Sequence, residues 1–235
     1  MPLLEAKNVT IRFGGLTAVS DFNLTIEPHE LVGLIGPNGA GKTTIFNILT
    51  GVYKPDEGAI FVNGKATRNC KPFDITALGV ARTFQNIRLF KELTVLDNVK
   101  IGGHLHYKYP SASAVLHTNR FHGAESIAEA DAIELLRIFN LEKRAQFYAR
   151  NLPYGDQRRL EIARAMAVRP KLLLLDEPAA GLNTGETIEL MAKIHEIRDR
   201  FNLTILLIEH NMELVMGICE RIVVLNFGKT IAQGT

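Results

Sequence analysis

Residues 36–44 form the segment with the clearest chemical meaning. They read Gly-Pro-Asn-Gly-Ala-Gly-Lys-Thr-Thr and follow a short apolar run, Leu31–Ile35, that is typical of a buried strand. Glycines let successive backbone N–H groups converge on phosphate oxygens, and the N-terminus of a following helix adds partial positive charge. The segment therefore predicts a phosphate-binding loop formed by Gly36, Pro37, Asn38, Gly39, Ala40, Gly41, Lys42, Thr43 and Thr44.

Two carboxylates after a second apolar run complete this chemistry. In an ATP site, Lys42 would reach the β- and γ-phosphates and the Thr43 hydroxyl would ligate Mg²⁺. Asp176 and Glu177 directly follow Leu172–Leu175. Asp176 would hold Mg²⁺, usually through water, and Glu177 would polarise the attacking water. The bland alternatives are a helix-capping turn and a strand that ends in solvated acids, but the two segments together favour ATP binding and hydrolysis.

The apolar patterns that must position these residues predict an α/β fold. Continuous runs are typical of parallel strands buried on both faces, and alternating runs with turn residues are typical of antiparallel strands. The expected strands are Leu3–Lys7, Val9–Phe13, Ala18–Ile26, Leu31–Ile35, Ala59–Val62, Leu172–Leu175, Thr204–Ile208 and Arg221–Leu225. The expected helices are Gly41–Leu49, residues 124–142, Asp156–Val168 and Gly185–Phe201. Ser126 and Glu129 have capping-box spacing at the start of the second helix, and residues 103–123 are interpreted as a loop or insertion.

These elements predict a single domain over residues 1–235. Its core and an antiparallel β-subdomain would come from about 1–85 and 153–235, with an inserted helical subdomain at 86–152. The hydrophobic share of 46% excludes a disordered chain, and a net charge of +2 gives no basic field for nucleic acid. Cys70 and Cys219 are expected to be reduced thiols of a cytoplasmic protein. No apolar run approaches the roughly 20 residues of a membrane span, and the charged N-terminus is unlike a signal peptide.

The order of four further motifs makes a family resemblance specific. Gln85 follows Thr83 and Phe84, the segment Leu152–Asp156 opens a helix, Ala179–Asn183 follows the acidic pair, and His210 follows another strand. This order resembles the nucleotide-binding subunit of ABC transporters over essentially the whole chain. The resemblance implies an ABC-type P-loop NTPase fold. Phe13 matches the aromatic residue that stacks on adenine in that family, although an ordinary strand residue is the alternative.

The details resemble one branch of the family. Arg82–Gln85, Leu152–Gly155 and Asp176–Asn183 are similar to the branched-chain amino acid importer ATPase with a tyrosine in its signature. A lipopolysaccharide-export ATPase is the alternative, but its signature usually keeps Ser-Gly-Gly, where this chain has Pro153, Tyr154 and Gly155. Non-transport ABC proteins are a less favoured alternative, because the sequence has no long coiled coil and only one cassette.

The resemblance also implies a mechanism and partners. Two cassettes, either two copies or this chain with a second ATPase, would pack head to tail, so that each ATP meets the other subunit's signature, here Leu152, Pro153, Tyr154, Gly155 and Asp156. Gln85 would contact Mg²⁺ and the attacking water, and His210 would hold the γ-phosphate. Two permease subunits would place the chain on the inner face of the membrane, and a periplasmic binding protein would deliver the solute. Such proteins usually continue past Gly234 into a terminal helix.

Three features leave alternatives open. Pro153 lacks a hydroxyl and a backbone N–H, so the composite site that uses this signature is expected to hydrolyse ATP more slowly. For Asp156, the alternative to a role in the signature is to cap the helix that follows. The apolar residues after Gln85 could pack at the base of the helical subdomain or line a groove for a permease helix; they are Ile87, Leu89, Phe90 and Leu93. Four histidines without metal-ligand spacing are expected to be solvated rather than metal-binding; they are His104, His106, His117 and His122.

Overall fold

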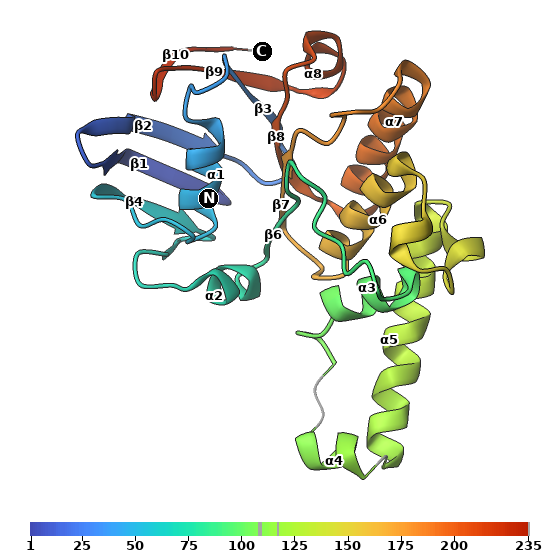
Figure 1. Ribbon diagram of the computed structural model, residues 1–235. Helices are drawn as coiled ribbons and strands as arrows, with labels where there is room; N and C mark the ends of the chain where they lie inside the picture. Colours follow the sequence, from blue (N-terminus) through green and yellow to red (C-terminus); the bar gives the residue numbers. More distant parts are fainter. Residues whose placement is uncertain (108–109, 117, 235) are drawn as a thin grey trace. The chain divides into compact units, whose positions relative to one another are not determined.

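The computed structural model describes residues 1–107, 110–116 and 118–234 and divides into two compact units (Figure 1). Unit 1 contains Met1–Gln85 and Lys171–Thr235, and unit 2 contains Asn86–Pro170. Residues 86–152, the predicted helical subdomain, all lie in unit 2, which continues through helix α6 (Tyr154–Met166). Both cysteines are free thiols. Within the described residues, no helix has the length and apolar character that crossing a membrane requires.

A six-stranded sheet organises unit 1. Its order is β10-β9-β3-β8-β7-β6, and every neighbouring pair is parallel except β9 and β10. The strands are β3 (Leu31–Ile35), β6 (Val80–Arg82), β7 (Leu172–Asp176), β8 (Thr204–Ile208), β9 (Arg221–Asn226) and β10 (Lys229–Gly234). The helices of this unit are α1 (Lys42–Leu49), α2 (Pro72–Ala77), α7 (Thr184–Phe201) and α8 (Met212–Ile218). The predicted parallel core is therefore present, and the sheet also contains β6 and β10, two strands that the sequence patterns missed.

An antiparallel sheet forms the second layer of unit 1. Its order is β2-β1-β4-β5, from β1 (Leu4–Phe13), β2 (Leu16–Ile26), β4 (Glu57–Val62) and β5 (Lys65–Ala66). The prediction of two strands at Leu3–Lys7 and Val9–Phe13 was wrong, because they are one strand. Asn8 has a left-handed backbone, with φ of 51°, where the register of β1 shifts. This bulge interrupts the two-residue alternation, so the sequence pattern appeared to break.

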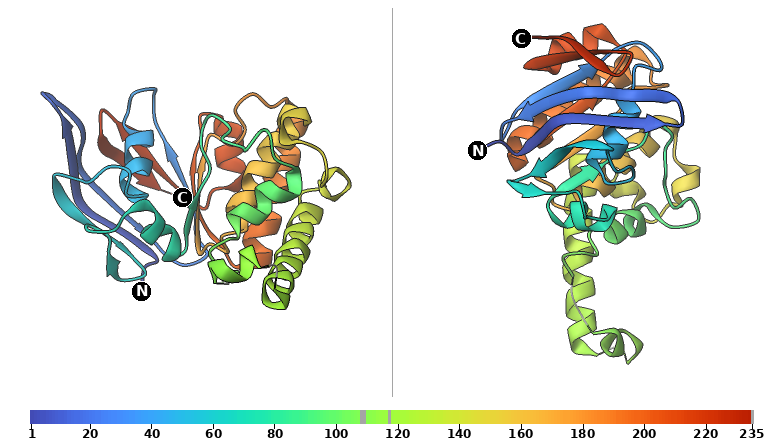
Figure 2. Two further views of the ribbon diagram at one scale, coloured as in Figure 1. Left: turned by 60° about the horizontal axis from the view of Figure 1, so that its bottom comes forward. Right: turned by 90° about the vertical axis from the view of Figure 1, so that its left-hand side faces the viewer.

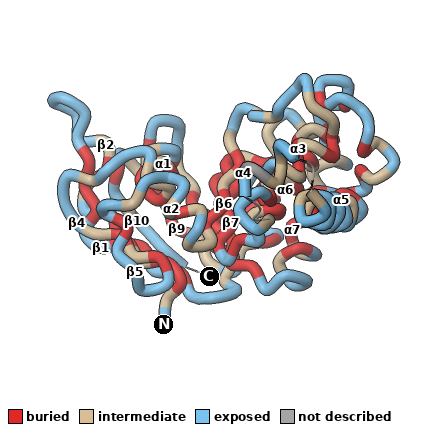
Figure 3. Tube along the Cα trace, turned by 90° about the horizontal axis from the view of Figure 1, so that it is seen from below, coloured by how far each residue is buried: buried red, intermediate tan, exposed pale blue. Residues whose placement is uncertain are grey.

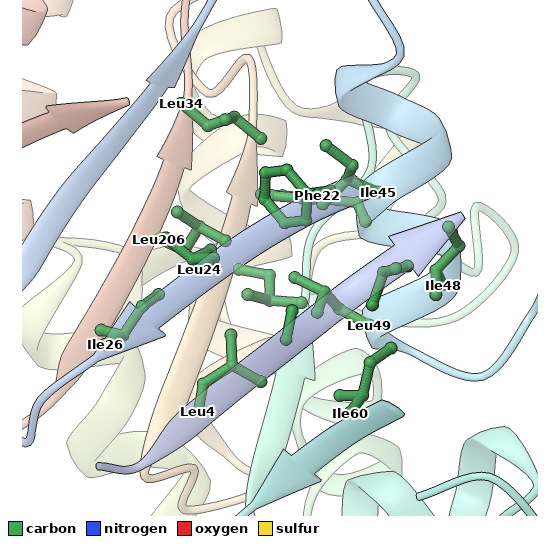
Figure 4. Close-up of a cluster of buried hydrophobic side chains, with 14 of the residues drawn as sticks. Leu4, Phe22, Leu24, Ile26, Leu34, Ile45, Ile48, Leu49, Ile60 and Leu206 are labelled. Atoms are coloured by element: carbon green, nitrogen blue, oxygen red, sulfur yellow. The ribbon is translucent and has the colours of Figure 1, made fainter. Parts of the chain in front are cut away.

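The core of unit 1 lies between its two sheets, with α1 packed between them (Figure 2). Figure 4 shows buried side chains that come from both sheets and from α1. They include Leu4, Phe22, Leu24 and Ile26 of the antiparallel sheet, Ile45, Ile48 and Leu49 of α1, Ile60 of β4, Leu34 of β3 and Leu206 of β8. The apolar face of α1 therefore fixes the helix, and with it the loop that precedes the helix, against the sheet.

Unit 2 is helical, with α3 (Val95–Gly102), α4 (Ser111–Val115), α5 (Asn119–Ile138), two short 3₁₀ turns and α6. In Figure 3 the surface of α5 is mostly exposed. The helix expected at 124–142 is α5, but its predicted limits were wrong. Thr118 precedes the helix in an extended conformation, so Ser126 lies within the helix and does not cap it. Asn140, with φ of 57°, ends it early, because a left-handed residue cannot continue a helix.

A buried ion pair joins β6, β7 and α1. Arg82 donates from Nη2 to Asp176 Oδ2 at 2.7 Å and from Nη1 to Asn47 Oδ1 at 2.7 Å. The side chains of Arg82 and Asp176 are 7% and 1% exposed. The Arg82 guanidinium also lies over the rings of Phe46 and Phe84. Because both charged groups are removed from water, the attraction between them offsets part of the lost hydration, and removing one partner would leave the other charge buried without compensation.

We predict that Arg82→Met lowers the free energy of unfolding by about 3–5 kcal/mol, because it leaves Asp176 buried without its counter-charge. The double variant Arg82→Met with Asp176→Asn should recover a large part of that loss, since the second change removes the uncompensated charge. Urea unfolding of the wild type, the two single variants and the double variant measures this coupling. Additive losses would contradict the prediction.

Candidate functional site

Four chain segments meet at one edge of the six-stranded sheet. The carboxyl ends of β3, β8, β7 and β6 lie side by side, with Ile208 of β8 opposite both Leu34 and Asp176. Each strand is followed by one predicted motif: the phosphate loop after β3, Gln85 after β6, Glu177 after β7 and His210 after β8. Ligands of open parallel sheets bind at this kind of edge.

The phosphate loop has a backbone that glycine alone can adopt. Gly36 has φ of 153°, and a Cβ there would lie 2.2 Å from the carbonyl oxygen of Leu225. Gly41 precedes α1 with φ of 98°. No side chain caps the first turn of α1 among the described residues, so its N–H groups remain open to an anion.

Lys42 is folded back on this loop. Its Nζ donates to the carbonyl oxygens of Gly36 at 2.7 Å and Pro37 at 3.0 Å. Burial lowers the pKa of the Lys42 ammonium, and the charges of Glu177 and Asp176 act in the opposite direction. The lysine is thus a positive charge held at the loop by two neutral acceptors.

Glu177 is held by two other predicted residues. Gln85 donates from Nε2 to Glu177 Oε2 at 2.8 Å, and His210 Nε2 lies 2.6 Å from Glu177 Oε1. Because a carboxylate only accepts, His210 carries a proton on Nε2 in this contact. Glu177 itself has a left-handed backbone, with φ of 48°, and its N–H donates to Ile208 at 2.9 Å. The sheet edge therefore brings together three residues that are far apart in the sequence.

Asp176 and Glu209 are buried acids with different surroundings. Asp176 Oδ2 accepts from Arg82, whereas Oδ1 is buried and has no hydrogen-bond partner among the described residues. Glu209 accepts from the backbone N–H groups of Ala179 at 2.8 Å and His210 at 3.1 Å. Burial raises the pKa of Asp176 and of Glu209. Sequence reasoning quoted Arg82 only as part of a motif and did not single out Glu209, although Arg82 ends β6 and Glu209 lies between β8 and His210.

A cavity of about 650 Å³ is lined by Lys42, Glu177 and their neighbours and also by aromatic side chains. One of these aromatic residues is Phe13, which is 45% exposed. Its ring packs edge-to-face against Tyr53, with 5.2 Å between the ring centroids. The residues that line the cavity are Phe13, Leu16, Thr17, Ala18, Asn38, Gly39, Gly41, Lys42, Thr43, Thr44, Gln85, Glu177, His210 and Phe227. The cavity therefore has one polar end at the phosphate loop and an apolar lining contributed by β1, β2 and the turn after β9.

The predicted signature belongs to unit 2. Pro153 precedes α6 and provides no side-chain cap, and the Leu152 carbonyl oxygen accepts from Gln157 Nε2 at 2.8 Å. Asp156 forms ion pairs with Arg144 and Arg159. The alternative in which Asp156 caps α6 is therefore wrong, because its carboxylate is turned to these two arginines.

Among the described residues, the histidines of the 104–122 stretch and the apolar residues after Gln85 do not line this cavity. His106 Nε2 lies 2.6 Å from the Val168 carbonyl oxygen, His122 stacks edge-to-face on Phe121, and His117 lies outside the described residues. Within the described residues, no cluster of three His, Cys, Asp or Glu side chains could hold a metal ion. Phe90 is 47% exposed and contacts the Arg164 guanidinium, so it is not part of a buried core.

Comparisons with known proteins agree with this geometry. Residues 19–180 match the family model of ABC transporters. The chain is 50% identical over 234 residues to the high-affinity branched-chain amino acid transport ATP-binding protein LivG of Escherichia coli (strain K12), covering 100% of this chain and 92% of that protein. The corresponding protein BraF of Pseudomonas aeruginosa is 48% identical, with the same coverage.

A solved structure of an ATP-binding cassette of an ABC transporter, in its ADP conformation, has a TM-score of 0.85 and 30% identity, covering 100% of this chain and 91% of that chain. The family resemblance and the fold class inferred from the sequence are thus confirmed. With its phosphate loop, paired acids and full-length relatives, the chain belongs to the ABC transporter family.

Proposed function

We propose that this chain is the ATP-binding and ATP-hydrolysing subunit of an ABC importer for branched-chain amino acids. The observation that carries the ATPase is the meeting of Glu177, Gln85 and His210 in one cavity with Lys42 and its loop. The names of the relatives from Escherichia coli and Pseudomonas aeruginosa support the solute class and favour it over lipopolysaccharide export.

ATP would bind by exchanging contacts that already exist. The β- and γ-phosphates replace the carbonyl oxygens of Gly36 and Pro37 as partners of the Lys42 ammonium. The open N–H groups of the first turn of α1 point to the same place and favour an anion. At the other region of the cavity, the half-exposed ring of Phe13 is available for stacking on adenine.

The site residues also fit a magnesium ion. Asp176 has a buried carboxylate oxygen without a hydrogen-bond partner among the described residues, and the Thr43 hydroxyl lines the cavity. Magnesium prefers oxygen ligands and keeps several waters, so Asp176, Thr43 and the Gln85 amide oxygen would hold it together with water. When bound, the ion neutralises charge on the β- and γ-phosphate oxygens.

Glu177 would act as the base for the attacking water. The hydrogen bonds from Gln85 and His210 orient its carboxylate in the cavity. His210 would turn to the γ-phosphate when ATP binds, which frees Glu177 Oε1 to accept a hydrogen bond from the attacking water. The contact between His210 and Glu177 would thus couple the arrival of ATP to the availability of the Glu177 carboxylate.

The assembly follows the same proposal. Two cassettes pack head to tail on the cytoplasmic side of two permease subunits, and closure on ATP drives transport. The tests use the complex with a second ATPase and a periplasmic binding protein, reconstituted in liposomes. ATP-dependent uptake of labelled leucine, isoleucine and valine is expected; ATP hydrolysis stimulated only by another class of solute would contradict the proposed cargo.

We predict that Lys42→Ala abolishes tight ATP binding, because it removes the ammonium that faces the β- and γ-phosphates. Isothermal titration of the purified subunit with Mg-ATP measures the loss. Lys193→Ala, a change to a lysine in a surface ion pair with Glu196, is the matched control and should leave the affinity unchanged. Micromolar ATP affinity in Lys42→Ala would exclude the proposed role.

Glu177→Gln should separate binding from hydrolysis. The amide retains the shape of the side chain but cannot accept the proton of water, so ATP should bind and remain intact. Thin-layer separation of labelled ATP and ADP after a single turnover measures hydrolysis, and size-exclusion chromatography detects a trapped ATP-bound dimer.

In the importer with a second ATPase, Glu177→Gln should reduce ATP turnover more than the equivalent change in the partner. The site that contains Glu177 would use the partner's signature, whereas the other site would use Pro153, which offers neither a hydroxyl nor a backbone N–H. Equal losses from the two changes would contradict this asymmetry, and turnover at the wild-type rate in Glu177→Gln would require a different base.

A further inference from the structure

Phe227 occupies a backbone position that disfavours it. Asn226 pairs with Lys229, so the turn between β9 and β10 contains only Phe227 and Gly228. Their φ angles are 44° and 75°, the left-handed pair of a tight hairpin turn. Asparagine, aspartate and glycine adopt the first position of such a turn readily, whereas the bulky side chain of phenylalanine is strained there.

The ring of Phe227 also lacks the burial that would compensate this strain. Phe227 is 84% exposed, more than any other large hydrophobic residue among the described residues. A strained and solvated phenylalanine is therefore unfavourable for the folded subunit on both counts. Backbone strain of this kind clusters at sites where a side chain serves a ligand.

The turn is held firmly beside the phosphate loop. Gly228 donates its N–H to the Ala40 carbonyl oxygen at 2.9 Å, and Ser20 donates its N–H to the Gly228 carbonyl oxygen at 2.9 Å. A Cβ at Gly228 would lie 2.4 Å from the Ala18 carbonyl oxygen, so the turn approaches β2 as closely as glycine allows. These contacts fix the position from which Phe227 projects.

Phe227 lines the same cavity as Phe13, Thr17 and Lys42. Lys42 would hold the phosphates, so the nucleoside is left with the apolar side chains of the lining, which include those of Phe13, Leu16 and Phe227. We propose that Phe227 is a second aromatic contact for the nucleoside of ATP, in addition to Phe13. This inference rests on the proposed ATPase function and deepens it.

An aromatic face stacks on any base without reading its hydrogen-bonding edge. Phe227 would therefore strengthen the binding of ATP and GTP alike and have no effect on a ligand without a base. Binding of the nucleotide would cover the exposed ring, so the cost of the strained turn is offset only in the bound state.

The test compares Phe227→Asn, Phe227→Tyr and the surface control Phe73→Asn, in the full-length subunit, by titration with Mg-ATP, Mg-GTP and inorganic tripolyphosphate. Phe73 is 61% exposed in α2 and does not line the cavity. Phe227→Asn should weaken ATP and GTP binding roughly tenfold and leave tripolyphosphate binding unchanged. Phe227→Tyr should bind both nucleotides like the wild type, since it keeps the ring.

Thermal unfolding gives a second readout of opposite sign. Phe227→Asn should raise the Tm of the nucleotide-free subunit by roughly 2–4 °C, because asparagine suits the turn. Phe73→Asn should leave the nucleotide affinities unchanged. Because Phe73 lies in α2 and not in a left-handed turn, this variant should not show the rise in Tm. A variant that is more stable and yet binds ATP less tightly cannot be explained by misfolding.

Three results would overturn the inference. The first is equal ATP affinity of the wild type and Phe227→Asn, and the second is a parallel loss of tripolyphosphate binding. The third is a loss of ATP binding that appears only at protein concentrations where the wild type dimerises, which would assign Phe227 to a subunit interface. Absence of ATP binding in the wild type would instead refute the proposed function itself. The two failures are therefore distinguishable.

Discussion

The site depends on one constraint, which is that neighbouring parallel strands end at the same edge of a sheet. β8 lies between β3 and β7, so Ile208 stands beside both the start of the phosphate loop and the acidic pair. β6 joins the outer side of β7 and delivers Gln85. The chemistry therefore needs no long-range loop to assemble it, because the register of the strands already places each short motif next to the others.

Charges at this edge are paired within the protein before any substrate arrives. Arg82 neutralises Asp176, backbone N–H groups satisfy Glu209, and Lys42 donates to two carbonyl oxygens. Burial opposes the charged forms of Lys42, Asp176 and Glu209, so leaving any of these charges unpaired would be costly. Substrate binding would then exchange one partner of a charged group for another, so that no buried charge has to be left unpaired.

Left-handed residues other than glycine have two different meanings in this fold. Asn8 and Asn63 lie in a bulge and a turn, where asparagine tolerates that backbone well. Glu177 and Phe227 tolerate it less well, and both line the same cavity. In Glu177 the unusual backbone accompanies the contacts with Gln85 and His210. His29 and Arg169 have the same left-handed backbone outside the cavity, so among the described non-glycine residues only Glu177 and Phe227 combine this backbone with a place in the cavity lining.

The sequence by itself determined the features that depend on local pattern. The phosphate loop, the apolar strands before it and before Asp176, and the helices α1, α6 and α7 were predicted within a few residues, because glycine content and apolar periodicity act over short stretches. The same patterns could not predict that β1 is one bulged strand, since the bulge depends on pairing with β2 and β4.

Only the tertiary structure decided how distant charges and rings meet. Arg82 pairs with Asp176 because β6 lies beside β7, and His210 reaches Glu177 because β8 lies beside β7. The placement of Phe227 beside the phosphate loop depends on the contact of Gly228 with Ala40. Such contacts join residues far apart in the chain, and no local propensity encodes them. The sequence therefore specified the parts of the site, whereas packing of the parallel sheet specified their partners.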